Sequence, residues 1–145
     1  MSTTTRTVSA TPEQVWEVLA DGWLYPLFVV GASRMREVDD TWPAVGSRLH
    51  HSVGTWPLLI DDTTEVLEVA EGSRLVLRAR AWPFGEAHVA IELHSEDGGA
   101  ATEIVLEETA VSGPGALVPD PAERLLLGWR NVEALRRLAM IIEGR

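Results

Sequence analysis

From about residue 32 onward, the chain repeats one pattern, in which short stretches of alternating apolar and polar residues are separated by tight turn signals. The stretches fall at residues 34–38, 47–53, 58–69, 74–82, 86–94 and 102–111. Alternation with a period of two is typical of strands that bury one face. Links this short can join only antiparallel neighbours, so the pattern predicts an antiparallel meander of about six strands. A further strand is expected at residues 4–10, which are short and β-branched.

Helical signals stand on both sides of this meander. Thr11, Pro12 and Gln14 form a capping-box start, and a second brief helix is predicted to end by Gly31. Residues 120–123 repeat the same start signal before a helix that reaches about Glu143, roughly 34 Å long at 1.5 Å per residue. Its predicted apolar face consists of Leu125, Trp129, Val132, Leu135, Ala139 and Ile142. Together these elements predict an α+β layer fold in a single domain, residues 1–145.

Composition excludes several function classes. Among 145 residues, 12 are basic and 22 acidic, a net charge of −10 that opposes binding to nucleic acids and to anionic membranes. All basic residues are Arg, so lysine chemistry is excluded, and the absence of Cys excludes thiolate chemistry and disulfides. No apolar run reaches the roughly 18 residues of a membrane span, and residues 1–6 do not resemble a secretory signal. We therefore expect a cytoplasmic protein without membrane insertion.

This order of elements resembles the helix-grip fold of the START-related, polyketide cyclase-like superfamily (SRPBCC). The resemblance spans nearly the whole chain and is carried by the TPEQVW helix opening, the hairpin RLVLRARAWPFGEAHVAIEL and the final helix GWRNVEALRRLAMIIEG. It implies a curved antiparallel sheet of about seven strands wrapped around the long C-terminal helix, with two short helices after the first strand and a ligand cavity inside. Members bind lipids, sterols, polyketides and other apolar molecules, and a minority catalyse cyclisation or dehydration with a few polar residues in the cavity.

The residues themselves also favour an internal space. A sheet of six or more strands twists and curls, so one helix on its concave face need not fill the interior. Gly128 lies within the predicted inward arc of the last helix, where glycine costs about 1 kcal/mol relative to alanine. It indicates either room for a ligand or close packing of the helix on its neighbours. The expected ligand-binding residues are Tyr25, Trp56, Leu77, Ala79, Ile91, Gly128, Asn131 and Val132.

The adjacent His50 and His51 are the strongest candidates for chemistry. Neighbours in a strand point to opposite faces, so one of them faces the interior, and the alternation does not tell which. For the same reason the two cannot bind one metal ion together, and no compact spacing of His and acidic residues supports a metal site. We expect neither a metal nor a cofactor.

Carboxylates supply the second half of a candidate acid–base pair. Asp61 and Asp62 point to opposite faces, so at least one of them lies inside. Glu65 follows in the same stretch, and Glu108 shares a face with apolar residues of the last strand. The candidate catalytic set is therefore His50, His51, Asp61, Glu65 and Glu108. By contrast, the row of Arg74, Arg78 and Arg80 opposite acidic neighbours is expected on a solvated outer face.

Two functions are consistent with these features. The first is binding of a small hydrophobic molecule, such as a lipid, a polyketide or another aromatic compound, in the internal cavity. The alternative is a cofactor-independent cyclase or dehydratase that uses an inward His and a carboxylate as acid and base. The expected partner is a small apolar molecule, and the oligomeric state, monomer or homodimer, stays open.

Overall fold

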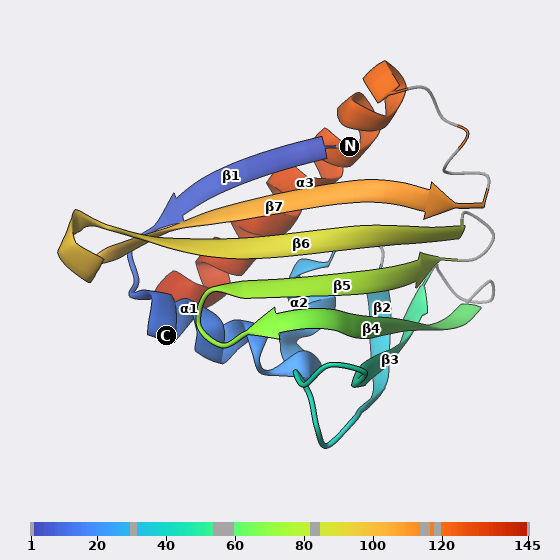
Figure 1. The fold of residues 1–145 in the computed structure, drawn as a ribbon, viewed down its shortest axis with the longest axis horizontal. Coiled ribbons are helices and arrows are strands. Elements are labelled where there is room, and N and C mark those ends of the chain that lie inside the picture. The colour runs from blue at the N-terminus through green and yellow to red at the C-terminus, as the bar shows by residue number, and fades with distance from the viewer. Residues whose placement is uncertain are drawn as a thin grey trace.

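The computed structural model describes residues 2–29, 32–53, 60–81, 85–113, 117 and 120–144. Its elements, in chain order, are β1 (Ser2–Val8), α1 (Pro12–Leu19), η1 (Gly22–Leu24), α2 (Tyr25–Phe28), β2 (Ala32–Val38), β3 (Arg48–Val53), β4 (Ile60–Ala70), β5 (Arg74–Ala81), β6 (Gly85–Glu96), η2 (Asp97–Gly99), β7 (Ala101–Ser112) and α3 (Asp120–Glu143). Seven antiparallel strands form one sheet in the order β1-β7-β6-β5-β4-β3-β2 (Figure 1). The predicted meander is confirmed, and the first strand closes it by pairing with the last.

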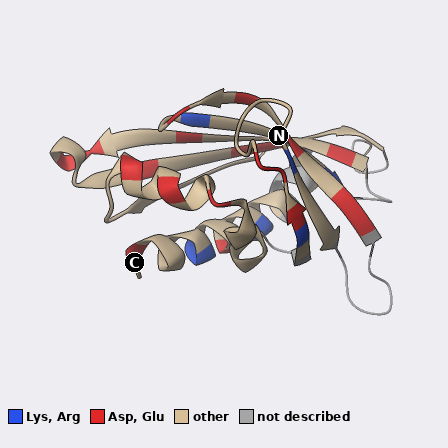
Figure 2. Cartoon of the chain, turned by 90° about the horizontal axis from the view of Figure 1, so that it is seen from below, with Lys and Arg blue, Asp and Glu red and all other residues tan. Residues whose placement is uncertain are grey.

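The helices lie together on one side of the curved sheet (Figure 2). Helix α1 begins at the predicted capping box: the Thr11 hydroxyl accepts a hydrogen bond from the Gln14 amide at 3.2 Å, and the Gln14 side chain accepts one from the Thr11 amide at 2.8 Å. This reciprocal pair satisfies two backbone donors that a helix start leaves free. The predicted helix-grip architecture is thus confirmed. Within the described residues, no helix combines the length and apolar character of a membrane span.

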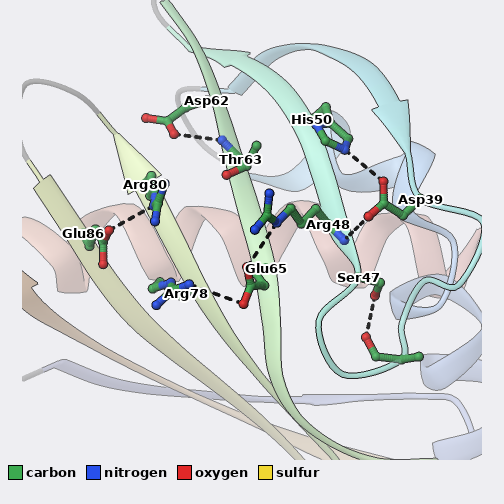
Figure 3. A network of polar contacts seen from close by, with 11 residues as sticks. Asp39, Ser47, Arg48, His50, Asp62, Thr63, Glu65, Arg78, Arg80 and Glu86 are labelled. Carbon is green, nitrogen blue, oxygen red and sulfur yellow. Dashed lines mark hydrogen bonds and ion pairs between the residues drawn. The ribbon is translucent and has the colours of Figure 1, made fainter.

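The two faces of the sheet differ in chemistry, as their alternation requires. The inner face, toward the helices, buries large apolar side chains of β3 to β7: Leu49, Val66, Leu75, Leu77, Ile91, Leu93, Ile104 and Leu106. The outer face carries ion pairs across neighbouring strands, among them Arg80 with Glu86 at 2.9 Å (Figure 3) and Arg74 with Glu92. The predicted exterior position of the arginine row is therefore confirmed.

The predicted apolar face of α3 is confirmed only in part: Leu135, Ala139 and Ile142 are buried. Leu125, Trp129 and Val132, expected to face the sheet, are 77%, 73% and 55% exposed. Apolar residues of this helix lie on two opposite stripes at 100° per residue. The stripe that packs inward consists of Asn131, Ala134, Leu135, Leu138, Ala139 and Ile142. The other stripe, continued by Met140, faces outward.

Candidate ligand-binding site

Near one end of β5, β6 and β7 the inner face carries small side chains, whereas further along these strands it carries large ones. Thr64, Ala79, Ala87 and Ala110 are register partners in turn, from β4 across β5 and β6 to β7. We call these four the small-residue row. Its three alanines are half-buried, whereas Leu75 and Ile104, further along the same face, are fully buried. The closest backbone approaches of α3 are to β1, α2 and α1, so the helix is nearest to one edge of the sheet and the row lies nearer its middle.

His51 lies next to this row on the inner face. Its side chain is buried, and Nε2 is 2.9 Å from the hydroxyl of Thr64. Burial is the main cause that lowers the pKa of His51. The charges of Arg36 and His50 lower this pKa further, whereas the charge of Asp62 raises it. The imidazole is therefore neutral at pH 7. Its Nδ1 atom has no hydrogen-bond partner in the described part of the structure.

His50, Asp61 and Glu65 lie on the outer face, away from the interior. His50 Nε2 is 2.9 Å from Asp39 Oδ1, and this hydrogen bond is the main cause that lowers the pKa of Asp39. Glu65 pairs with Arg48 at 3.1 Å and with Arg78 at 3.3 Å (Figure 3).

Asp61 is exposed and accepts a hydrogen bond from Ser52 at 2.8 Å. The alternation of β3 and β4 is the physical reason for these positions: each of these residues is an odd number of positions from an inward neighbour. These three members of the predicted catalytic set therefore do not line the interior.

Two acidic residues do share the inner face. Asp62 is the register partner of His51, so the expectation that one of the paired aspartates faces inward is met by Asp62 and not by Asp61. Glu108 is 5% exposed and pairs with Arg130 of α3, which ties the helix to the sheet. The two residues are far apart in the sequence, and no sequence signal predicts that they pair. Among the described residues, no three His, Asp or Glu side chains are grouped as metal ligands.

The helix contributes Asn131 to the interior. This side chain is 4% exposed, and its Nδ2 atom has no hydrogen-bond partner among the residues described. The neighbouring Gly128 lies against the start of β1, where an added Cβ would sit 3.8 Å from the Ser2 hydroxyl, which is an ordinary contact. An alanine would therefore fit at this position, so the contact does not show that close packing requires glycine here. Val132 faces outward, so its predicted contact with an internal ligand is not supported.

Of the other predicted ligand-binding residues, Leu77 is buried on the inner face beside the small-residue row, and Ile91 is buried further along β6. Tyr25 is buried, but its hydroxyl donates a hydrogen bond to the Leu19 carbonyl at 3.0 Å.

The ring of Tyr25 packs edge-on against Trp42 at 5.5 Å, and burial raises the pKa of its hydroxyl. Tyr25 thus belongs to the apolar cluster of the short helices. Trp56 lies outside the described residues.

Comparisons with known proteins agree on the fold. The family model described as polyketide cyclase / dehydrase and lipid transport matches residues 2–143. No sequence among the curated proteins matches the chain.

Three solved structures illustrate the likeness. A conserved protein from Geobacillus kaustophilus has a TM-score of 0.73 at 13% identity, covering 98% of this chain and 94% of that chain. A START superfamily protein from Mycobacterium smegmatis has 0.71 at 16%, covering 98% and 96%. The Zhui aromatase/cyclase from Streptomyces sp. R1128 has 0.70 at 22%, covering 99% and 93%. At these identities the likeness shows the fold, and the family match completes the assignment: the chain belongs to the family described as polyketide cyclase / dehydrase and lipid transport.

Proposed function

We propose that the protein binds a small, mainly apolar molecule between the inner face of the sheet and helix α3. The observation that carries this proposal is the small-residue row. A sheet face that packs directly on a helix is normally filled by large side chains to the density of an organic crystal. Here three alanines pair across β5, β6 and β7 and stay half-buried, while Leu77, Ile91 and Leu106, further along the same strands, are buried.

The expected affinity follows from the area that a ligand would bury. About 400 Å² of apolar surface at about 25 cal/mol per Å² gives roughly 10 kcal/mol, from which association removes at least about 4 kcal/mol. The remaining ~6 kcal/mol corresponds to a dissociation constant of the order of tens of micromolar. Tighter binding would require hydrogen bonds from the polar side chains of the interior.

Binding can be tested with the neutral fluorophore N-phenylnaphthylamine. We expect a saturable, one-to-one rise in its emission with the wild-type protein, and loss of that rise in Ala87→Phe, whose ring would fill the row. Ala90→Phe is the matched control, because Ala90 lies on the same strand, pairs with Val76 and faces outward. Equal binding by both variants, or no saturable binding by the wild type, would contradict the proposal. Native mass spectrometry of the protein from its own host then looks for the retained molecule.

A second candidate function is acid–base catalysis of a cyclisation or dehydration. One specific observation favours it: a neutral imidazole with an Nδ1 atom that no described residue bonds, beside Asp62 on the inner face. Such a group can take a proton from a carbon acid, with no cofactor. On this interpretation His51 is the base, and Asp62 stabilises the imidazolium that forms.

The test uses a synthetic β-polyketone thioester whose aromatisation is followed by ultraviolet absorbance. A catalyst of this kind would accelerate the reaction and lose about 10²–10⁴-fold in rate in His51→Gln, with His50→Gln unchanged. If the wild-type protein binds a ligand saturably but does not accelerate the reaction, catalysis is ruled out and only the binding function stands.

A further inference from the structure

Helix α3 carries an apolar stripe on the side that faces away from the sheet. Leu125, Trp129, Val132 and Met140 follow one another at intervals close to whole turns, so they share one side of the helix, and they are 55% to 77% exposed. Arg136 lies on the same side, and its Nη1 atom is 3.5 Å from the Met140 sulfur. We call these five residues the outer stripe.

The exposed area of the outer stripe is that of a small protein interface. Its four apolar side chains expose on the order of 500 Å² per copy, given the usual size of such side chains. Soluble monomers rarely expose a larger continuous apolar patch, and such patches commonly mark interaction sites. Two copies that covered this stripe against each other would bury about 1,000 Å² in all, the size at which specific interfaces begin.

The order of residues along the outer stripe is symmetric in position. The pairs Leu125/Met140 and Trp129/Arg136 share one midpoint, which falls just after Val132. In a two-fold interface, a contact of one residue with a second is always matched by the reverse contact. Two antiparallel α3 helices that cross at this midpoint therefore place Leu125 against Met140 of the second copy, and Trp129 against Arg136 of the second copy, each contact made twice.

The charged groups beside the outer stripe are compatible with this arrangement. Arg136 donates two hydrogen bonds to Glu133, from Nε at 2.9 Å and from Nη2 at 2.8 Å. A bidentate bond of this kind uses the edge of the guanidinium plane, whereas stacking on an indole uses its face. Arg136 can therefore keep Glu133 and also stack on Trp129 of the second copy in a cation–π contact.

Charge argues against an anionic lipid surface as the occupant of the stripe. A helix that binds such a surface relies on arginines that meet the headgroups. Here Arg136 and Arg137 both pair with Glu133, and Arg130 pairs with Glu108. The chain also has a net charge of −10, which opposes approach to anionic lipids. Repulsion between two copies is weaker, because salt at about 0.1 M screens charges that are more than about 10 Å apart.

We propose that the outer stripe is a self-association surface, on which a second copy of this chain packs its own α3 antiparallel in a two-fold dimer centred just after Val132. The stripe lies on the side of α3 opposite to the proposed ligand site, so this inference does not depend on the proposed function. An interface of this size predicts a dissociation constant on the order of tens of micromolar. The protein is then a monomer in the dilute solutions used for denaturation.

Sedimentation equilibrium from about 1 µM to about 1 mM, a range that brackets this constant, tests the association. We expect the average mass to rise from 15.9 kDa toward twice that value. Trp129→Ala should raise the dissociation constant at least about tenfold, as removal of a central aromatic side chain does. Trp23→Ala is the matched control, because Trp23 is 57% exposed but lies on η1, and it should change the constant by less than about twofold.

A mass that stays at that of one chain throughout would overturn the inference, and so would equal effects of the two substitutions. If the wild type stays monomeric and instead cosediments with neutral phosphatidylcholine vesicles, the stripe binds lipid and the inference is wrong.

Cysteine cross-linking tests the antiparallel geometry, since the chain has no Cys of its own. In the proposed dimer, Val132→Cys places two thiols beside the two-fold axis, and a short bismaleimide should join them. Leu125→Cys is the matched control, because its two thiols would lie about 22 Å apart at 1.5 Å per residue and should stay separate. A mixture of Leu125→Cys and Met140→Cys should give the mixed product.

Self-linking of Leu125→Cys without the mixed product would show a parallel pair and contradict the proposed geometry. No product from Val132→Cys, at concentrations where the mass shows a dimer, would place the interface elsewhere. Far-ultraviolet circular dichroism confirms that each variant is folded.

Discussion

At the scale of single residues, adjacent positions in one strand have different chemistry. His50 belongs to an outer network with Asp39, while His51 is buried on the inner face with a lowered pKa. The sequence shows the pair but not its orientation, because a one-residue slip of register exchanges the two faces. The orientation of the two histidines follows only from the register of β3 with β4, in which His51 is the partner of Asp62.

The lowered pKa of His51 predicts how stability depends on pH. Between its folded pKa and its ordinary value of 6.5 the unfolded chain binds more protons at this site, so the free energy of unfolding rises with pH in that window. Stability is thus lost as pH falls below 6.5. Asp62, Arg36 and His50 act on the imidazole, but burial is the larger cause.

We expect urea midpoints of the wild type to decline from pH 7 to pH 5 more steeply than those of His51→Leu. The difference between the two curves removes the common contribution of the other histidines. Parallel curves would show that His51 is not desolvated.

Asn131 offers a second prediction at this scale. Replacing it by Leu removes an amide nitrogen that is buried without a bond to any described residue, at nearly equal volume. An unbonded buried donor costs about 1–3 kcal/mol, so Asn131→Leu should raise the free energy of unfolding by about 1 kcal/mol. Urea denaturation of the unliganded protein measures this change. A loss of stability would mean that the amide has a structural partner.

At the scale of elements, the sequence predicts the length of helix α3 closely and its buried face only in part. Its limits, Asp120–Glu143, follow from the Asp-Pro start and were predicted closely. Half of the predicted face is exposed because apolar residues occupy both stripes, and the inward stripe includes a polar residue, Asn131, that a search for apolar periodicity omits. Tertiary packing, not the periodicity of α3, selects the stripe.

The two stripes of α3 should differ in their effect on stability. Leu135 is 1% exposed and Trp129 is 73% exposed. Leu135→Ala should cost about 2–5 kcal/mol through the cavity that it leaves, and Trp129→Ala about 0.5 kcal/mol or less. Chemical denaturation of both variants measures the contrast. Equal losses would place Trp129 in a packed contact and contradict the assigned orientation.

At the scale of the whole molecule, the sequence predicted the architecture because each of its signals is local. Capping boxes, alternation and short turns define the helices and the meander without any distant contact. The contacts that complete the candidate site are distant ones: Glu108 with Arg130, His51 with Thr64, and the alignment of three alanines from different strands. Such contacts depend on register and on the position of α3, which composition and spacing do not specify.

The central claim, that a small molecule lies between the sheet and α3, is tested most directly by two-dimensional nuclear magnetic resonance of the protein titrated with 2-naphthol. Side-chain methyl and imidazole signals should then shift for inner-face residues alone: Ala79, Ala87, Val89 and His51. Along β6, Ala87 and Val89 should respond while Ala90 should not, since alternate residues face opposite ways. Shifts gathered instead on the outer face, or on the exposed stripe of Leu125 and Trp129, would contradict the account.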